Sequence, residues 1–540
     1  MSIPEADPNP HTAPPSTGSD APAPTEHIDR RGWLALTCIA LGVSLVIMDA
    51  TIVNVALPVV IEDLGLSAAD AQWTNATYSL VFAALLLTVG RLGDLRGRRR
   101  LLISGMILFM AASAVAGAST SPLMLIGSRL VQGLGAAMIV PSALSTLNAM
   151  FSGRARTIAF AVWGSAIGGM AAIGPLVGGW LATDASWRWA FWLNIPIGVL
   201  IVAGIIRAVP ETRDPATTPG GDPVGVALSA LGMGAIVFAL IEGHWFGWWR
   251  QEDGSISPVG PALTAGIVLI LVFIGYERRR ATLGRSALMD LGLFRLRSFR
   301  SGVIAAMIVA LGEFGLLFTL PLLLQGSLGY TALGTGAIIV ALALGTFLIS
   351  GMLPQLSKRM SRRAIVQVGL ALEALAIGAL ALTVSTTIST WLICLLLFVY
   401  GIGVGMATAQ LTALLLSDVP PRESGQASGI QSTIRQLGSA LGVAALGGLL
   451  INQLTNATQH NLAALRLPAD TIDALTTAVS ESAGTAIAGL QASPPSPGIA
   501  QAVTNAMISA SHTTLWVAAA VLFVGLLFTL RLPSRGRSDR

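Results

Sequence analysis

Charged side chains stand inside long apolar stretches of this sequence, and Asp49, Arg129 and Glu313 are the principal ones. A charged group at the centre of a bilayer costs at least ~2.5 kcal/mol on insertion scales, so such groups usually face a cavity or a partner. Asp49 and Arg129 are expected at comparable depths in two membrane helices, where they can face each other. A proton- or substrate-linked role for Asp49 is favoured over a purely structural Asp–Arg lock.

Glu313 lies in the segment Leu311-Gly-Glu-Phe-Gly315 and is expected to be the matching acid of a second group of helices. Its flanking glycines allow a backbone or a ligand to approach closely. Proton exchange and a structural role are both open for this residue. Glu373 and Glu242 are weaker candidates, for which structural roles are favoured.

Enzyme signatures are missing from the sequence. It contains no HExxH, no GxSxG and no Cys/His metal-site spacing. Lys358 is the single lysine and does not belong to a phosphate-binding loop. Cys38 and Cys394 both lie in apolar runs, so neither a disulfide framework nor a thiolate metal site is expected. We therefore expect neither catalysis nor a cofactor.

Composition excludes a soluble globular protein. Of the 540 residues, 53% are hydrophobic and 11% are charged, whereas soluble domains carry about 25% charged residues. The mean hydropathy is +0.73. The net charge of +5 comes from short basic clusters between apolar stretches, which is typical of membrane topology, so a nucleic-acid partner is not expected.

The apolar stretches predict an all-α membrane protein with about fourteen transmembrane helices, because each is near the ~20 residues that a bilayer requires. The predicted spans are 33–57, 71–92, 101–121, 123–149, 156–182, 190–209, 223–245, 258–276, 300–325, 331–354, 364–385, 388–416, 424–451 and 513–531.

The distribution of Arg and Lys predicts that both termini are cytoplasmic, since cytoplasmic loops collect positive charge. The segment 1–29, rich in Pro, Ala, Ser and Thr, is expected to be a disordered cytoplasmic tail. The segment 452–511 is then an extracytoplasmic loop that forms a small cap. The basic clusters expected inside the cell are Arg30–Arg31, Arg96–Arg100, Arg154, Arg156, Arg207, Arg213, Arg278–Arg300, Lys358–Arg363, Arg422 and the C-terminal arginines.

A faint internal repeat predicts two six-helix halves. Gly90–Arg100, after the second span, is echoed by Gly351–Arg363, after the tenth. The spacing places the halves at 33–209 and 300–531, with the helix pair 223–276 inserted between them. Transporters are commonly built from such repeats, with the substrate held between them.

The loop Gly90–Arg100 also contains an acid, Asp94, among five basic residues. Positive-inside topology accounts for the arginines but not for this carboxylate. An acid at a helix junction can bind an Arg or a helix N-terminus, and such a lock can break when the halves move. A gating role for the loop is therefore favoured.

The fifth span carries the run Gly174-Pro175-Leu-Val-Gly178-Gly179. Small residues allow close helix contact in membranes, and Pro175 removes a backbone hydrogen bond and is expected to kink the helix. Ordinary glycine-rich packing explains scattered glycines better than it explains this compact pattern.

Taken together, these segments resemble the major facilitator superfamily, in the fourteen-helix drug:proton antiporter branch (EmrB/QacA group). The resemblance implies that Met48–Pro58 is the motif of the first helix and that Arg129–Gly135 is the fourth-helix motif, whose Arg is linked to proton transfer. It also implies an antiporter motif containing Gly174, Pro175, Gly178 and Gly179. The family's cytoplasmic gate motif corresponds to Gly90–Arg100, with Gly90, Asp94, Gly97 and Arg98.

The resulting prediction is a proton-coupled exporter of hydrophobic or amphipathic small molecules, such as drugs or antibiotics, that works by alternating access. Its partners would be a small-molecule substrate, protons and the lipid bilayer. The Arg-dominated, Ala- and Gly-rich composition fits a bacterium with GC-rich DNA and hence the plasma membrane. Export of a lipid or another cell-envelope metabolite is the alternative. A non-transporting scaffold or sensor, with a partner bound by 452–511, is a second one.

Overall fold

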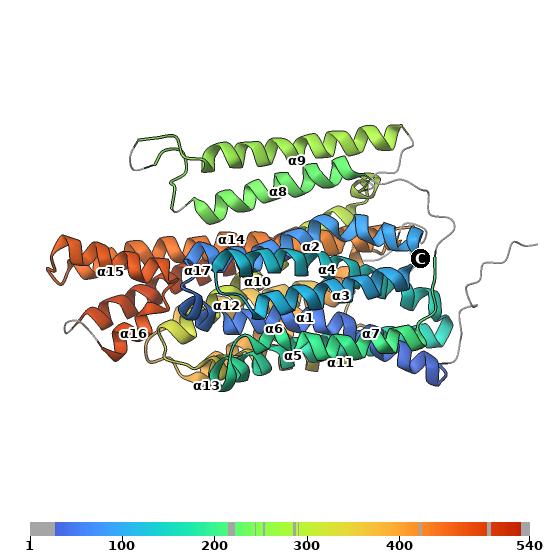
Figure 1. Ribbon diagram of the computed structural model, residues 1–540, viewed down its shortest axis with the longest axis horizontal. Helices are drawn as coiled ribbons and strands as arrows, with labels where there is room; N and C mark the ends of the chain where they lie inside the picture. Colours follow the sequence, from blue (N-terminus) through green and yellow to red (C-terminus); the bar gives the residue numbers. More distant parts are fainter. Residues whose placement is uncertain are drawn as a thin grey trace, which may run out of the picture.

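The computed structural model describes residues 28–213, 222–243, 245–251, 254–283, 288–289, 291–420, 424–493 and 498–530. Within these ranges the chain is helical, apart from loops, a bridge residue at Phe151 and an isolated bridge between Arg250 and Ile256. The long helices share one direction and form an elongated bundle (Figure 1).

The first group of helices is formed by residues up to Ala208. A π-helix, Leu181–Ala185, follows α5 directly. The helices are α1 (Arg30–Leu64), α2 (Ala68–Arg96), α3 (Arg98–Gly117), α4 (Pro122–Met150), α5 (Gly153–Trp180), α6 (Trp189–Trp192) and α7 (Asn194–Ala208).

The rest of the chain forms a separate pair and a second group. The pair is α8 (Pro223–Glu242) and α9 (Val259–Thr282). A short 3-10 helix, Leu291–Arg295, precedes the second group. That group contains α10 (Arg297–Gly326), α11 (Ala332–Leu356), α12 (Arg362–Thr383), α13 (Thr390–Leu415), α14 (Ser424–Ala463), α15 (Ala469–Glu481), α16 (Ala486–Ala492) and α17 (Ile499–Thr529).

Local sequence explains where several helices begin and end. Ser67 and Asp70 form a reciprocal capping box at the start of α2, which satisfies backbone N–H groups that have no partner within the helix. The Thr331 and Ser361 side chains cap α11 and α12 in the same position. Gly65 ends α1 in the left-handed conformation, with φ of 61°, which glycine adopts without steric cost.

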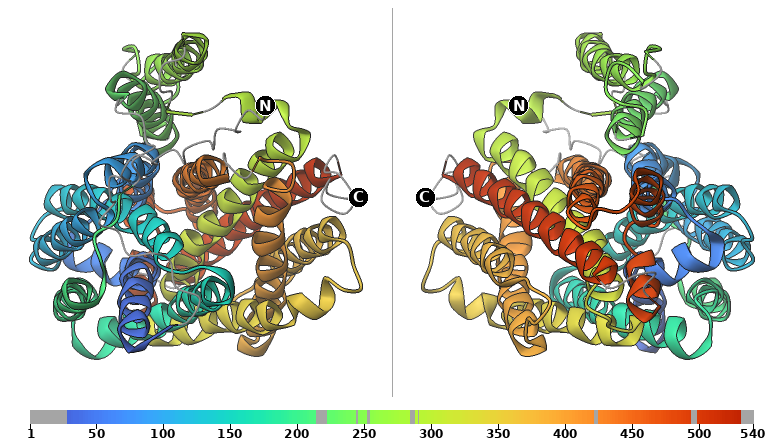
Figure 2. Two further views of the ribbon diagram at one scale, coloured as in Figure 1. Left: turned by 90° about the vertical axis from the view of Figure 1, so that its right-hand side faces the viewer. Right: turned by 90° about the vertical axis from the view of Figure 1, so that its left-hand side faces the viewer.

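The two groups lie side by side, and the pair α8–α9 stands outside them. Viewed along the bundle, α1–α7 occupy one side and α10–α17 the other (Figure 2). The pair reaches the bundle through α8, which packs against α2 and α14. The indole N–H of Trp73 on α2 donates to Glu242 on α8 over 2.9 Å, so Glu242 has a structural contact here.

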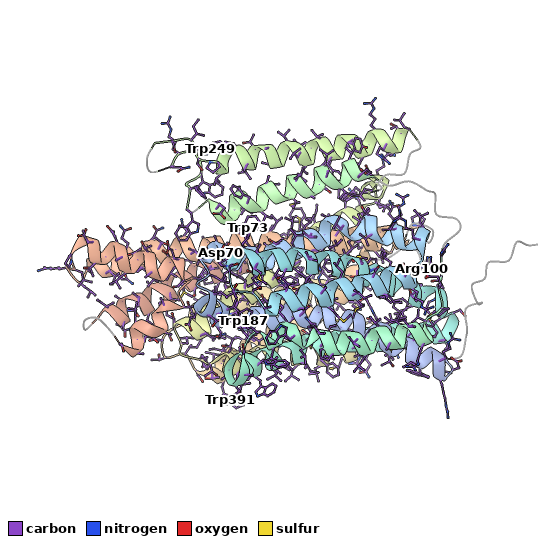
Figure 3. The ribbon with its side chains drawn as sticks, in the orientation of Figure 1. Asp70, Trp73, Arg100, Trp187, Trp249 and Trp391 are labelled. Carbon is purple, nitrogen blue, oxygen red and sulfur yellow. The ribbon has the colours of Figure 1, made fainter. Side chains whose placement is uncertain are left out.

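The bundle has two distinct ends. We call the end that carries α15 and α16 the cap end, and the opposite end, where Arg30 begins α1 and Arg100 lies, the arginine end (Figures 1 and 3). In this bundle α2 runs from the cap end to the arginine end, whereas α14 runs the other way (Figure 1).

The segment 452–511 is more helical than a cap loop. α14 continues to Ala463, α17 already begins at Ile499, and α15 and α16 lie between them. The sequence concealed this extension because its polar residues lower the local hydropathy. In the structure Thr455 donates its hydroxyl hydrogen back to the Ile451 carbonyl, which a helix accommodates, while Leu454 and Leu462 stay buried.

Thirteen helical segments in the described parts of the chain are long and apolar enough to cross a bilayer. Each coincides with a span predicted from the sequence; the stretch 190–209 is formed by α6 and α7 together. The remaining predicted span, 156–182, forms α5, which is not among the thirteen. The all-helical membrane fold is confirmed, and the count of fourteen stays a prediction.

Glycine contacts hold neighbouring helices at close range, which yields a first test. A Cβ atom added at Gly401 of α13 would overlap the Leu342 backbone of α11, whereas one added at Gly351 meets nothing within 4 Å. Overpacking of a filled interior costs about 1–3 kcal/mol. We expect Gly401→Val to lower the thermal unfolding midpoint of the purified protein clearly. Gly351→Ala should leave the midpoint unchanged; equal midpoints for both variants would contradict this packing.

Candidate functional site

Asp49 of α1 and Arg129 of α4 form a fully buried ion pair. The Arg129 Nη1 atom donates to Asp49 Oδ2 over 2.5 Å, and the side chains are 1% and 0% exposed. The structure thus brings together the two charges that the sequence placed at similar depth. A buried ion pair requires further hydrogen bonds because desolvation of the two charges offsets much of their attraction.

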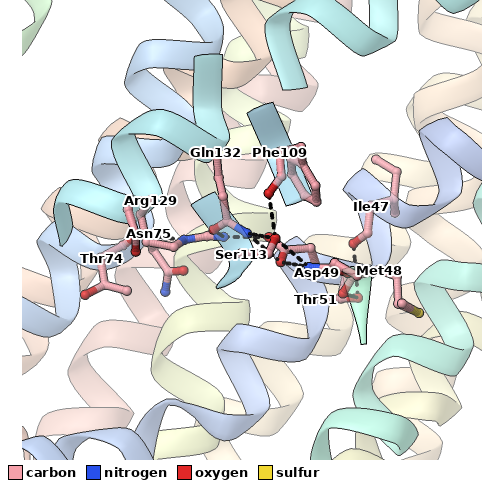
Figure 4. A network of polar contacts seen from close by, with 12 residues as sticks. Ile47, Met48, Asp49, Thr51, Thr74, Asn75, Phe109, Ser113, Arg129 and Gln132 are labelled. Carbon is pink, nitrogen blue, oxygen red and sulfur yellow. Dashed lines mark hydrogen bonds and ion pairs between the residues drawn. The ribbon is translucent and has the colours of Figure 1, made fainter. Parts of the chain in front are cut away.

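Those further hydrogen bonds come from three polar side chains (Figure 4). Asp49 Oδ1 accepts from the amide of Asn194 at 2.7 Å and from that of Gln132 at 3.1 Å. The same two amides also donate to the hydroxyl of Ser113, at 3.1 and 2.8 Å. Four helices, α1, α3, α4 and α7, therefore meet around one carboxylate, which accepts hydrogen bonds on both oxygens.

Arg129 is held from the other side by α2. Its Nε atom donates to the Thr74 carbonyl over 3.3 Å, and its guanidinium lies 4.2 Å from the centre of the Tyr78 ring. The Gln132 carbonyl oxygen accepts from Nη1 at 2.8 Å. Gly133 permits this approach, since a Cβ there would lie 2.6 Å from the Tyr78 carbonyl oxygen.

Sequence reasoning did not assign Gln132, Asn194 or Ser113 to the site. Gln132 could have been found, because it stands three residues after Arg129 and so shares its helix face. Asn194 carried a weaker signal, as an amide in an otherwise apolar run. Ser113 gave none, since single serines are common in membrane helices and only the fold brings this one to Asp49.

The glycines of the GPxxGG segment lie between the two groups of helices. Gly174 and Gly178 face α1, where an added Cβ would overlap Thr51 and lie 3.0 Å from the Ile52 backbone. Gly179 faces α11, where a Cβ would lie 2.5 Å from the Ala332 carbonyl oxygen; Pro175 touches Gly336 of α11 through its own carbonyl. α5 stays α-helical through Pro175, and the predicted kink remains a prediction.

Two further hydrogen bonds between the two groups lie at the cap end, while α2 and α14 pack against each other along the bundle. The Gln325 amide of α10 donates to the Val55 carbonyl of α1 over 2.9 Å. The backbone N–H of Leu333 donates to the Thr183 hydroxyl over 3.0 Å. The two groups are therefore fastened to each other at this end of the bundle.

A second acid–arginine pair lies in the second group. Arg435 Nη2 of α14 is 3.3 Å from Glu313 Oε2 of α10, with the side chains 36% and 12% exposed. The glycines that flank Glu313 serve helix contacts: Gly315 packs on the α14 backbone and Gly312 on α17. This pair is less buried than Asp49–Arg129.

At the arginine end, the junction of α2 and α3 contains the predicted gate segment. Gly90 packs against Pro141 of α4. Gly97 has a φ of 120°, a conformation that favours glycine, and the Arg98 backbone N–H donates to Thr212. The Asp94 side chain lies outside the described residues.

The carboxylate that caps α3 is Glu211, which sequence reasoning missed. Its oxygens accept from the backbone N–H groups of Arg99 and Arg100 at 3.1 and 3.3 Å, and Arg100 Nε lies 3.7 Å away. An anion at a helix N-terminus is stabilised by the exposed N–H groups and the helix dipole. Glu211 thus joins the end of α7 to the gate segment.

Comparison with known proteins identifies the family. The sequence pattern of the Major Facilitator Superfamily matches residues 39–443. The chain belongs to this superfamily. It is therefore a multi-pass membrane transporter, and the helices described above are its membrane domain.

Curated relatives come from bacteria. The chain is 32% identical to the probable actinorhodin transporter of Streptomyces coelicolor, over all of both chains. It is 33% identical to the multidrug efflux pump LfrA of Mycolicibacterium smegmatis, over 80% of this chain and 83% of that one. Among solved structures, a bacterial homolog to the human lysosomal transporter Spinster shares the fold, with a TM-score of 0.62, 17% identity and coverage of 94% and 99%.

The α1–α5 contact gives a second test. Gly178→Val places a branched side chain against the Ile52 backbone, whereas Gly164→Ala on the same helix meets nothing within 4 Å. We expect Gly178→Val to abolish transport in vesicles, because the valine side chain would push α5 away from α1 beside Asp49. Gly164→Ala should transport at the wild-type rate. Full transport by Gly178→Val would show that this contact is dispensable.

Glu211 gives a third test. Its replacement by Gln removes a charge worth about 0.3–1 kcal/mol at a helix N-terminus and should lower the thermal unfolding midpoint slightly. Glu481→Gln, at an exposed position of α15, is the matched control and should not change it. Equal midpoints for the two variants would rule out the capping role.

Proposed function

We propose that the protein is a proton-coupled exporter of hydrophobic or amphipathic small molecules that works by alternating access between two six-helix halves. The observation that carries the proposal is the Asp49–Arg129 pair, a charged group fully buried in a membrane transporter. Intramembrane ionisable residues of this kind mark proton and ion pathways.

The class of cargo is supported by the relatives. Their names describe probable transport of actinorhodin and efflux of multiple drugs, and cephamycin export and puromycin resistance in other cases. These compounds differ in structure but are small organic molecules. We therefore assign drugs or antibiotics as the cargo, in the plasma membrane of a bacterium.

Asp49 is the proposed proton acceptor. When the Asp49 carboxylate is protonated, it loses its negative charge. Arg129 thereby loses its ionic partner. The guanidinium then retains its hydrogen bonds to the Gln132 oxygen and the Thr74 carbonyl and its contact with the Tyr78 ring. None of these carries a compensating negative charge, so protonation favours a rearrangement of α4 relative to α1.

The GPxxGG segment is the proposed route from this proton to the motion of the halves. Gly174 lies against Met48 and Thr51 of α1. These two residues flank Asp49 and Ala50 in the sequence. Gly179 touches α11 of the other group. A shift of α1 at Asp49 therefore displaces α5, and with it the contact that fastens the halves at the cap end.

The proposed halves are residues 33–209 and 300–531, with 223–276 as an inserted pair and 452–511 outside the cell. Both termini are then cytoplasmic, and the arginine end faces the cytoplasm. The fastened cap end corresponds to a state closed toward the outside. Glu313 would be a second coupling residue, and the segment with Gly90, Asp94, Gly97 and Arg98 would gate the cytoplasmic side together with Glu211.

The free energy released when one proton moves down its electrochemical gradient is large enough to drive such export. At ~2.3 kcal/mol per charge per 100 mV, a driving force of ~150 mV supplies about 3.5 kcal/mol per proton. Because a tenfold gradient corresponds to ~1.4 kcal/mol, one proton can sustain roughly a 300-fold gradient of a neutral substrate.

Asp49→Asn tests the proposal directly. Asparagine keeps the shape of the side chain but cannot take up a proton. We expect inverted vesicles with wild-type protein to move protons when lipophilic cations are added, and vesicles with Asp49→Asn to behave like empty ones. Asp63→Asn is the control, since Asp63 lies on the same helix but pairs with Arg188 at the cap end and is 45% exposed; it should retain coupling.

Two results would overturn the proposal. Export that continues unchanged after the proton gradient is collapsed excludes proton coupling. Vesicles that respond to none of the compounds would favour a lipid cargo or a scaffold role, which accumulation assays with labelled lipids would then separate.

A further inference from the structure

Glu373, near the middle of α12, is a buried carboxyl group without a hydrogen-bond partner. Its side chain is 0% exposed, and neither carboxyl oxygen has a partner among the described residues. Asp49, equally buried, accepts hydrogen bonds on both oxygens. These two equally buried acids, one in each group of helices, therefore sit in opposite surroundings.

The Glu373 side chain is enclosed by α13. A Cβ added at Gly403 would lie 2.7 Å from Glu373 Cγ, and Gly369, one turn earlier on α12, meets the Gly403 carbonyl. Tyr400, three residues before Gly403, is also 0% exposed, and its hydroxyl has no partner in the described part of the chain. A carboxyl and a phenol thus share an otherwise apolar interior.

Charged groups on other helices act on Glu373 from a distance. Glu373 lies within electrostatic range of the Glu313 carboxylate of α10 and the Arg435 guanidinium of α14. Those two groups are already paired with each other. α17, which also packs on α12, contributes His512 as its titratable group, and that ring accepts from Trp516 at 3.4 Å.

An ionised carboxylate is not stable in such a place. Charge burial without a partner costs several kcal/mol, and the group takes up a proton instead. Glu373 is therefore neutral in this conformation, while Asp49 is paired with Arg129.

We propose that Glu373 is a second proton-binding site of the transporter and that it carries a proton in the conformation closed at the cap end. When the proton leaves, the Arg435 guanidinium compensates the negative charge that stays on the Glu373 carboxylate. In that step the carboxyl O–H bond breaks and the proton passes to water in the opened half. The carboxylate that remains is compensated by Arg435 once the Glu313 pair loosens.

The arrangement of helices supports this assignment. Glu373 stands on the third long helix of the second group and Tyr400 on the fourth. In the first group the third and fourth helices supply Ser113 and Gln132 to the Asp49 network. The third long helix of the second group thus carries an acid and that of the first group a hydroxyl, and this acid lacks, among the described residues, the hydrogen-bond donors that Asp49 has.

Infrared spectroscopy tests the protonation without any transport. The purified wild-type protein at neutral pH should show the carbonyl absorption of a protonated carboxyl group, and Glu373→Gln should lose it. Glu242→Gln, which removes the glutamate held by Trp73, is the matched control and should keep it. An absorption of equal size in wild type and Glu373→Gln would overturn the proposal.

The thermal unfolding temperature distinguishes a proton-binding role of Glu373 from a structural one. It can be measured on Glu373→Leu even if Glu373→Gln folds poorly. Leucine fills a similar volume with no polar atom, so Glu373→Leu should unfold at the wild-type temperature or above it. A lower unfolding temperature for Glu373→Leu would mean that Glu373 holds a stabilising contact, and the proposal would fail.

The carrier role rests on the proposed proton-coupled export, and its test is kept distinct. Vesicles with Glu373→Gln should move fewer protons per substrate exported than wild type, with substrate affinity unchanged. The same ratio in both would overturn the carrier role while coupling by wild type stands. Absence of proton movement in wild type would refute proton coupling itself, and the infrared result would still decide whether Glu373 holds a proton.

Discussion

A carboxylate and a guanidinium that are both shut away from water constrain the first group of helices more than any other contact. The attraction between Asp49 and Arg129 offsets their desolvation only when the remaining donors and acceptors are satisfied. α3, α4 and α7 supply Ser113, Gln132 and Asn194 for that purpose. The positions of these helices around α1 are therefore coupled to the charge on one carboxyl group.

The same constraint links chemistry to motion. Small residues bring α5 against α1 next to Asp49, and the opposite edge of α5 against α11. In the proposed mechanism, a change in the charge of Asp49 would alter the partners of Arg129 within the first group, and α5 would carry the change to the second. Because packed helices have a few discrete arrangements and do not deform continuously, one proton can decide between two states of the whole bundle.

Sequence reasoning predicted the fold and the meeting of Asp49 with Arg129 because both rest on strong local signals. Long apolar runs identify the membrane helices, and single charges within them identify Asp49, Arg129 and Glu313. The residues that it missed depend on the fold: Ser113 resembles any helical serine, and Glu211 reaches the start of α3 only because α7 ends beside it. The helical extension of α14 was hidden by Thr and Asn residues that lower hydropathy without breaking a helix.

Glu373 is a residue whose surroundings could not be predicted from the sequence. Its sequence favoured a structural role, but a structural carboxyl group needs a partner, and the described residues provide none. Asp49 of the first group is thus paired with an arginine, whereas Glu373 of the second group has no partner among the described residues. A transporter built in this way can hold one proton-binding site ready while the other is filled.

The most direct test of this account is the release of protons when substrate binds to purified protein in an unbuffered detergent solution. If substrate and proton compete through the Asp49 network, adding a lipophilic cation should acidify the solution in proportion to the amount bound. Tight binding of the cation without any change in pH would contradict proton-coupled exchange at this site.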